Sequence, residues 1–173
     1  MPNIIQQLID HYQFDRIPVE GTLYKSTYVS PVKHQGVPIV TSIIGMYCHN
    51  PFSASYFHRL TQDETWHFYG GDAFELYLLF PNGQTEIVVM GPDFSAGQRL
   101  QFTIPALVWQ AGKLTNQGDY ALFGCTLAPG FTGDCFEGGT FEQLIKQFPA
   151  QKKLIEELSI KEENGHLPEG FQQ

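Results

Sequence analysis

Charged side chains are scarce in this sequence, and basic ones are the scarcest. Asp, Glu, Lys and Arg make up only 16% of the 173 residues, and 18 acidic against 10 basic residues give a formal net charge of −8. No segment gathers lysine and arginine, so the chain offers no basic surface to a nucleic-acid backbone or an anionic membrane. We therefore expect neither nucleic acid nor membrane as a partner.

Cysteine is also rare, and long apolar runs are missing. The three cysteines, Cys48, Cys125 and Cys135, form no C-x-x-C pair of the kind that builds a zinc ribbon. Residues 1–10 have neither the basic start nor the apolar core of a signal peptide. No run approaches the roughly 20 apolar residues that cross a bilayer, so we expect a cytoplasmic protein with reduced thiols.

Aromatic and turn-forming residues, by contrast, are abundant. Aromatic residues make up 14% of the chain, which excludes intrinsic disorder, and there are 17 Gly and 11 Pro. This composition is unlike that of a helical bundle and is typical of many short strands joined by turns. The length corresponds to one domain, so we predict a single domain over residues 1–173.

Short runs of β-branched and aromatic residues, each ended by a turn signal, fill residues 21–136. Because no helical pattern separates them, they predict an antiparallel sandwich or barrel. Asn82-Gly83 predicts a hairpin turn within this region. The expected strands are 22–30, 39–47, 53–60, 65–69, 74–80, 85–90, 100–104 and 120–127, with a further one near 108–112.

Helical periodicity is confined to the two ends of the chain. Residues 4–9 place four aliphatic side chains on one face. Thr140 and Gln143 form a capping box before an apolar stripe that stops at Pro149, and residues 151–160 repeat the pattern. We expect one N-terminal helix, two short C-terminal helices within about 140–162, and a loose tail after them.

The densest group of polar and aromatic side chains is the segment 57–71. Side chains alternate between the two faces of a strand, so Glu64 and Trp66 should share one face and His67 should lie on the other. His58 lies on the preceding expected strand, across a turn at 61–63. We expect His58 and Glu64 to meet as cross-strand neighbours.

These residues resemble the first motif of the cupins, which are β-barrels of the jelly-roll type. That motif contains Gly, His-x-His, Glu and a second Gly, and His58, Glu64 and Gly71 stand at the spacing it requires. Phe52 replaces the opening Gly, and Leu60 replaces the second His.

The second cupin motif, Pro-x-Gly-x-x-His, is similar to residues 105–110. Leu107 replaces its Gly and Gln110 replaces its metal-binding His. Of the four ligand positions of metal-binding cupins, the chain therefore retains only His58 and Glu64. Because such sites usually have three protein ligands, we expect no cofactor. If a divalent metal is bound, the resemblance implies His58, Glu64 and Gln110 as its ligands.

One branch of the cupins, the uncharacterised cupin family five, resembles nearly the whole chain, from about residue 4 to residue 148. Thr22 and Leu107 depart from its usual pattern. The resemblance implies an all-β fold, an antiparallel double-stranded β-helix (the jelly-roll cupin barrel) over about residues 21–136. The stretches that carry it are Glu20-Gly21 with Tyr24, 52–54, 58–60, 63–72, 97–99, 105–111 and 124–131.

This branch is similar in fold to the epimerases that act on dTDP-sugars. In those enzymes a His removes the proton beside a ketone and a Tyr returns one. The resemblance implies that His58 could act as the base, oriented by Glu64, whereas eight tyrosines leave the acid open. The catalytic candidates are His58, Glu64 and His67, and the substrate-binding candidates are Arg59, Trp66, Gln101, Trp109 and Gln110.

Several of these candidates also have purely structural interpretations. His58 could be a core histidine whose ring nitrogens are hydrogen-bonded within the protein, and His67 could make a structural hydrogen bond. The two tryptophans could belong to the core, and Arg59 could be ion-paired at the surface. Cys125 is interpreted as an inert buried thiol.

Three functions therefore stay open. The first is a metal-independent isomerase or epimerase acting on a small sugar-like or keto ligand, the second a metal-dependent cupin enzyme, and the third a non-enzymatic small-molecule-binding protein. Related cupins commonly form dimers through strands near the N-terminus. We therefore expect a homodimer with residues 22–30 in or near the interface.

Overall fold

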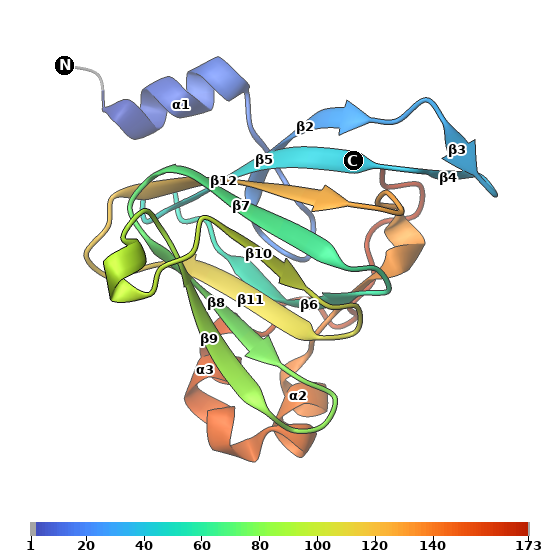
Figure 1. The fold of residues 1–173 in the computed structure, drawn as a ribbon. Helices are drawn as coiled ribbons and strands as arrows, with labels where there is room; N and C mark the ends of the chain where they lie inside the picture. The colour runs from blue at the N-terminus through green and yellow to red at the C-terminus, as the bar shows by residue number, and fades with distance from the viewer. Residues whose placement is uncertain (1–2, 173) are drawn as a thin grey trace.

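The computed structural model describes residues 3–172 and consists mainly of two facing antiparallel β-sheets (Figure 1). The six-stranded sheet has the order β1 (Asp15–Arg16), β2 (Leu23–Val29), β5 (Thr41–Cys48), β12 (Tyr120–Leu127), β7 (Glu64–Gly71) and β10 (Gln101–Ile104). The five-stranded sheet has the order β13 (Phe136–Gly138), β6 (Ser55–Leu60), β11 (Trp109–Leu114), β8 (Phe74–Leu79) and β9 (Thr85–Met90). A small hairpin pairs β3 (Lys33–His34) with β4 (Val37–Pro38).

From β5 to β13 the chain passes back and forth between the two sheets, with the β8–β9 hairpin as the exception. This path is the jelly-roll arrangement, so the predicted fold class is confirmed. All nine expected strands are present. The additional strands β1, β3, β4 and β13 have only two or three residues, which is too short for a periodic pattern.

Aromatic rings fill one end of the space between the sheets. Tyr47, Trp66, Phe74 and Phe123 pack with ring centroids 4.5–6.4 Å apart. A Cβ atom on Gly45 would lie 2.3 Å from the Phe123 ring, so only glycine leaves room for it at this place in β5. Burial of these rings supplies much of the hydrophobic stabilisation, and two of them, Trp66 and Phe123, also line the cavity that contains His58 and Glu64.

The helices cover the outer faces of the sheets. Asn3 caps α1 (Ile4–Tyr12), whose apolar face covers Leu23 and Met46 on the six-stranded sheet. Thr140 accepts a hydrogen bond from the Gln143 backbone and so begins α2 (Phe141–Gln147), as its sequence predicts. Together with α3 (Lys152–Leu158), α2 covers the five-stranded sheet (Figure 1).

The C-terminal segment, residues 161–172, runs across the open end of the barrel. The sequence predicted a loose tail here, whereas the structure shows contacts with the barrel. The backbone N–H of Gly138 donates to the carbonyl of Gly165 (2.7 Å), which ties the segment to β13. Leu167 and Phe171 then pack against the core, with the Phe171 ring 6.5 Å from that of Tyr24. Within residues 3–172, no helix is both long enough and apolar enough to cross a membrane.

Candidate functional site

The two cupin-like motifs meet inside the barrel. His58 on β6 is paired with Gln110 on β11, as the motif spacing predicts, and both side chains point between the sheets. Glu64 and Trp66 come from β7, in the facing sheet. The expectation that His58 and Glu64 are cross-strand neighbours is wrong, because the turn at 61–63 carries the chain from one sheet to the other. The two side chains instead border one cavity from opposite sheets.

A buried hydrogen-bond triangle holds the Glu64 carboxylate. The Gln110 amide donates to Glu64 Oε2 (2.9 Å), and the Trp66 indole N–H donates to the same oxygen (3.2 Å). The indole N–H also donates to Gln110 Oε1 (3.1 Å). Because an indole N–H can only donate, this contact fixes which end of the Gln110 amide faces Glu64. Trp66 and Gln110 therefore hold Glu64 in one orientation.

The environment of Glu64 raises the pKa of its carboxyl group. Burial raises the pKa of the Glu64 carboxyl, and this outweighs the lowering effect of nearby His58. A second carboxylate, Glu20, raises the Glu64 pKa further. Glu64 therefore takes up a proton at a higher pH than an exposed glutamate does.

His58 is held in one tautomer by the backbone. Its Nδ1 lies 2.8 Å from the carbonyl oxygen of Tyr56, which can only accept, so Nδ1 carries the hydrogen. In the neutral ring, Nε2 then has a free lone pair. The ring stacks on Phe136 at 5.3 Å between centroids, which fixes its plane. The sequence reasoning gave the orienting role to Glu64, but the Tyr56 carbonyl performs it.

The cavity bordered by these residues is very small. Its volume is about 10 Å³, which is room for about one water molecule. Leu60, Phe131 and Phe136 separate it from a much larger pocket of about 920 Å³, which we call the mouth pocket. The inner cavity is lined by Ile17, Glu20, Thr22, Ile43, His58, Leu60, Glu64, Trp66, Phe123, Cys125, Phe131 and Phe136.

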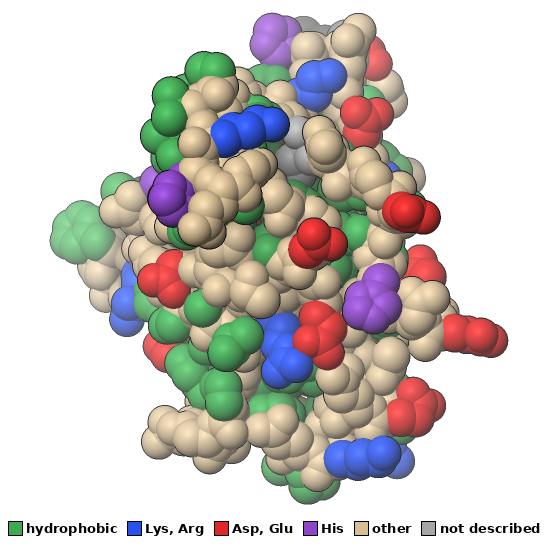
Figure 2. All heavy atoms as spheres, turned by 90° about the vertical axis from the view of Figure 1, so that its right-hand side faces the viewer, with side chains coloured by type: hydrophobic (Ala, Val, Ile, Leu, Met, Phe, Trp, Pro, Cys, Tyr) green, Lys and Arg blue, Asp and Glu red, His purple; other side chains and the backbone are tan. Residues whose placement is uncertain are grey.

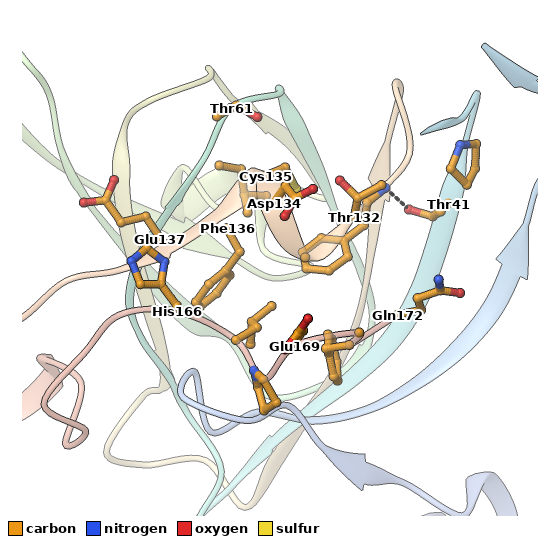
Figure 3. A pocket seen from close by; sticks show the side chains of 18 of the residues that line it. Thr41, Thr61, Thr132, Asp134, Cys135, Phe136, Glu137, His166, Glu169 and Gln172 are labelled. Atoms are coloured by element: carbon orange, nitrogen blue, oxygen red, sulfur yellow. Dashed lines mark hydrogen bonds between the residues drawn. The ribbon is translucent and has the colours of Figure 1, made fainter. Parts of the chain in front are cut away.

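The mouth pocket lies between the barrel end and the C-terminal segment (Figure 3). Figure 3 shows Glu137 and His166 together on one wall and Thr41 and Gln172 on the other. Seen from the side of the β3–β4 hairpin, acidic and basic side chains lie next to each other in the middle of the surface (Figure 2). The pocket is therefore polar and of mixed charge at its rim, and apolar where it meets the inner cavity.

Arg59 lies at this pocket, but its charge is already paired. Its guanidinium contacts Glu137 at 2.7 Å and 2.8 Å and lies 4.5 Å from the centre of the Trp109 ring. Trp109 itself is buried against α2 and α3. Arg59 therefore reaches the pocket rim, whereas Trp109 belongs to the core on the far side of its sheet.

His67 and Gln101 do not reach the cavity. They are paired in register on β7 and β10, and Gln101 Nε2 lies 3.2 Å from His67 Nδ1 on the outer face of the sheet. The opposite facing of His67 and Glu64 agrees with the strand alternation. Gln101 was expected to bind the substrate, but it shares the outer face of His67 and does not line the cavity.

The sequence did not predict two polar residues of the cavity, Glu20 and Thr22. Both residues line the inner cavity, although they precede β2 and lie outside the two cupin-like motifs. The signal available in the sequence was Glu20-Gly21, within the first stretch that resembles cupin family five. Apart from this resemblance, nothing in the sequence around Glu20 indicates that its side chain is buried.

The predicted ligands do not fit a metal ion in this arrangement. Glu64 Oε2 already accepts two hydrogen bonds, and Gln110 turns its NH₂ group, which cannot coordinate a cation, toward Glu64. Among the described residues, no three His, Cys, Asp or Glu side chains are placed to hold a metal. We derive no step through a metal.

The buried carboxyl predicts a characteristic pH dependence of stability. The folded state raises the pKa of Glu64, so its favourable contribution is present at low pH and is lost as the pH rises through the folded pKa. Glu64→Gln keeps the two hydrogen bonds and removes the charge. We expect its melting temperature to exceed that of the unmodified protein by a few degrees at about pH 8, with the difference closing toward about pH 4.

Calorimetry across this pH range checks the expectation, with exposed Glu86→Gln as the matched control. The control should change the melting temperature little at any pH. A Glu64→Gln protein that is less stable than the unmodified protein throughout would show that the ionised carboxylate stabilises the fold.

The sequence matches the family described as "Cupin superfamily (DUF985)" over residues 6–139. This chain belongs to that cupin family. No curated protein matches the sequence. The family match spans the barrel and includes both motifs that form the inner cavity.

Solved structures resemble this cupin closely. A Shewanella oneidensis protein is 32% identical, with a TM-score of 0.85 over 94% of this chain and 100% of that one. A hypothetical protein from Leishmania major is 25% identical, with a TM-score of 0.80 over 90% and 98%. A cupin 2 conserved barrel domain protein from Rhodopseudomonas palustris shares the fold at 14% identity, with a TM-score of 0.54 over 83% of each chain.

Proposed function

We propose that this cupin binds a small polar ligand, sugar-like or keto, and acts on it as a metal-independent isomerase or epimerase. The observation that carries the proposal is the tautomer of His58. Its Nδ1 is committed to the Tyr56 carbonyl, so a basic Nε2 is left beside a cavity that also contains a buried carboxyl. A positioned imidazole is the side chain that proteins use most often as a general base, here for removing a proton beside a carbonyl.

The two pockets suggest how such a ligand is accommodated. The inner cavity is too small for a sugar, whereas the mouth pocket is large enough for a molecule of that size. We propose that the body of the ligand occupies the mouth pocket. Its reactive end then passes Leu60, Phe131 and Phe136, which must move aside, and reaches His58 and Glu64.

A thermal-shift panel of nucleotide sugars, free sugars and small keto acids tests the proposal. A ligand at 100 times its Kd stabilises the protein by about 2.7 kcal/mol. Each ligand that binds is then incubated in D₂O with catalytic amounts of protein, and deuterium at the carbon beside its carbonyl is measured. Deuteration supports the isomerase, binding without deuteration supports the non-enzymatic binding protein, and a panel without any binder contradicts both.

We also propose that the protein is a homodimer that pairs through β2. Beyond Tyr24, the described chain gives β2 only one neighbour, β5, so the other edge of β2 is free. Tyr28 and Val29 are exposed along this edge. A free edge with apolar side chains is the type of strand that pairs with a second chain.

Light scattering should give about twice the chain mass of 19.5 kDa at micromolar concentration. Tyr28→Lys should shift the protein toward the monomer, whereas Ile87→Lys, at an exposed position on β9, should not. A monomeric mass for the unmodified protein contradicts the proposal.

A further inference from the structure

The turn that joins β10 to β11 contains a leucine in a backbone conformation that leucine rarely adopts. Leu107 has a φ of +67°, in the left-handed region that favours glycine. The backbone N–H of Val108 donates to the carbonyl of Pro105 (3.3 Å), so Leu107 is the third residue of a four-residue turn. A positive φ at this place is typical of a type II turn, in which glycine is the usual residue. Leu107 therefore occupies a strained position.

Hydrogen bonds to a neighbouring segment keep the turn in this conformation. The backbone N–H of Leu107 donates to the carbonyl of Leu60 (2.8 Å), and the backbone N–H of Ala106 donates to Asp63 Oδ1 (2.8 Å). Two successive residues of the turn are therefore attached to the segment 60–63, which follows from the end of β6. A strained conformation persists where the surrounding contacts over-determine it. We therefore expect the backbone to keep this conformation when the side chain at position 107 is changed.

Packing in the core does not account for the leucine at this position. Leu107 is 48% exposed, and hydrophobic stabilisation grows with the apolar area that is removed from water. The residue therefore combines a strained backbone with incomplete burial of its side chain. Glycine would remove the strain and would give up only the smaller part of a leucine's burial. Strained residues of this kind cluster at active sites and ligand-binding sites, so the surroundings of Leu107 decide what the side chain does.

Leu107 lines the mouth pocket close to the point where that pocket meets the inner cavity. Its hydrogen-bond partner Leu60 lines both pockets. Leu60 is also two residues from His58 on β6, so the two side chains share one face of the strand. On the other side, β11 begins two residues after Leu107 and carries Gln110, which is paired with His58. A ligand that reaches His58 from the mouth pocket passes Leu60, and Leu107 lies beside that route.

We propose that Leu107 determines specificity at this site by contacting an apolar group that the ligand carries close to its reactive carbonyl. The inference rests on the proposed function and narrows its class of ligands. The side chains of Leu107 and Leu60 offer only C–H surface, which cannot hydrogen-bond a hydroxyl group. Alkyl-substituted keto acids and deoxygenated sugars fit such a surface. A ligand with a hydroxyl group at the same place loses the hydrogen bonds that water gave to that group.

The first test needs no ligand and asks whether Leu107 serves the fold. Leu107→Gly and Leu107→Ala both remove the side chain, but only glycine suits the left-handed backbone. We expect Leu107→Gly to melt about 2–4 °C above Leu107→Ala and no lower than the unmodified protein. A Leu107→Gly protein that melts clearly below the unmodified protein would show that the leucine stabilises the fold, and this result overturns the proposal.

Leu100 supplies the matched control, because it is a second exposed leucine with an ordinary backbone conformation. It is 62% exposed, its φ is negative, and it lies outside the mouth pocket. At this position the order of the two variants should reverse. Leu100→Gly should melt below Leu100→Ala, because glycine increases the conformational entropy of the unfolded chain and relieves no strain here. The same order at both positions would show that Leu107 is not strained and would remove the reason for assigning it a role.

The second test compares ligands that differ by single CH₂ groups, namely pyruvate, 2-oxobutanoate and 2-oxopentanoate, by thermal-shift titration. Burial of one CH₂ group improves affinity by up to about fourfold, so the unmodified protein should bind 2-oxopentanoate about tenfold more tightly than pyruvate. In Leu107→Gly this ratio of Kd values should fall to about twofold or less, whereas Leu100→Gly should keep it. Glucose and 6-deoxyglucose give the same comparison for sugars, with the deoxy sugar preferred only while Leu107 is present.

The outcomes separate this proposal from the proposed function. If ligands bind but Leu107→Gly keeps the preference for the longer or deoxygenated ligand, Leu107 does not determine specificity. If Leu107→Gly binds every ligand more tightly, the leucine obstructs the pocket and does not contact the ligand. Either result overturns the proposal and leaves the proposed function intact. If nothing in the panel binds the unmodified protein, the proposed function fails and the ligand preference fails with it.

Discussion

Replacing His58 by Gln should abolish turnover while leaving ligand binding nearly intact. Gln places an amide near the position of Nε2, so it can still donate to or accept from a ligand, but it cannot take up a proton at neutral pH. Loss of a positioned general base typically lowers the rate by 10²–10⁴-fold, roughly. We expect deuterium incorporation to fall by at least about 100-fold and the thermal shift by the ligand to persist.

His58→Asn is the matched control for the fold. Asn is shorter, and its side-chain NH₂ can keep the donation to the Tyr56 carbonyl that Nδ1 makes. It leaves the Nε2 position empty, so it should lower both binding and turnover while the protein stays folded. If His58→Gln deuterates ligands at the unmodified rate, His58 is not the base. If both variants bind and react normally, the cavity is not the site.

The sequence predicts the strand pairing of His58 with Gln110, but it does not predict that Glu64 lies in the facing sheet. The register of His58 with Gln110 follows from the spacing of the two motifs, because each motif lies on a strand of fixed alternation. The facing of Glu64 relative to His67 follows from the same rule. The position of Glu64 opposite His58 does not follow from strand alternation. A three-residue turn is compatible both with a hairpin within one sheet and with a crossing between two sheets. Only the burial of both strands in facing sheets decides it.

Other features of the site depend on contacts between residues far apart in the sequence, which a local sequence pattern does not predict. Glu20 lies in a loop, where side-chain direction has no period. Its hydroxyl partner Thr22 is in turn bonded to Ser55, which is 33 positions further along the chain than Thr22. The ion pair of Arg59 with Glu137 joins β6 to β13, and β13 was too short to be predicted. The covering of the barrel mouth depends on just two apolar side chains, Leu167 and Phe171, within a polar segment.

Removing those two side chains should open the barrel mouth. Leu167 and Phe171 pack against the apolar cluster that separates the mouth pocket from the inner cavity. The rest of the segment is mostly exposed, so its docking depends strongly on these contacts. Leu167 and Phe171 are partly buried, and truncating two such apolar side chains should together cost more than about 1 kcal/mol. The double variant Leu167→Ala with Phe171→Ala should therefore raise the open population by about tenfold.

The three cysteines report this opening without a ligand. Cys135 lines the mouth pocket, Cys125 lines the inner cavity, and Cys48 lies under α1 in a separate cluster. Burial raises the pKa of all three thiols, to about 11 for Cys48 and Cys135, so alkylation requires exposure. In the double variant we expect alkylation of Cys135 and Cys125, measured by peptide mass spectrometry, to accelerate by at least about tenfold, with Cys48 unchanged.

Leu8→Ala supplies the reciprocal control. Leu8 packs on α1 against the cluster of Cys48, so its truncation should accelerate alkylation of Cys48 and leave the other two thiols unaffected. Equal acceleration of all three thiols in the double variant would mean that global unfolding, and not opening of the mouth, governs access. Acceleration at Cys135 alone would show that Leu60, Phe131 and Phe136 close the inner cavity without the C-terminal segment. Selective exposure of both Cys135 and Cys125 would make this segment the barrier that a ligand must displace to reach His58.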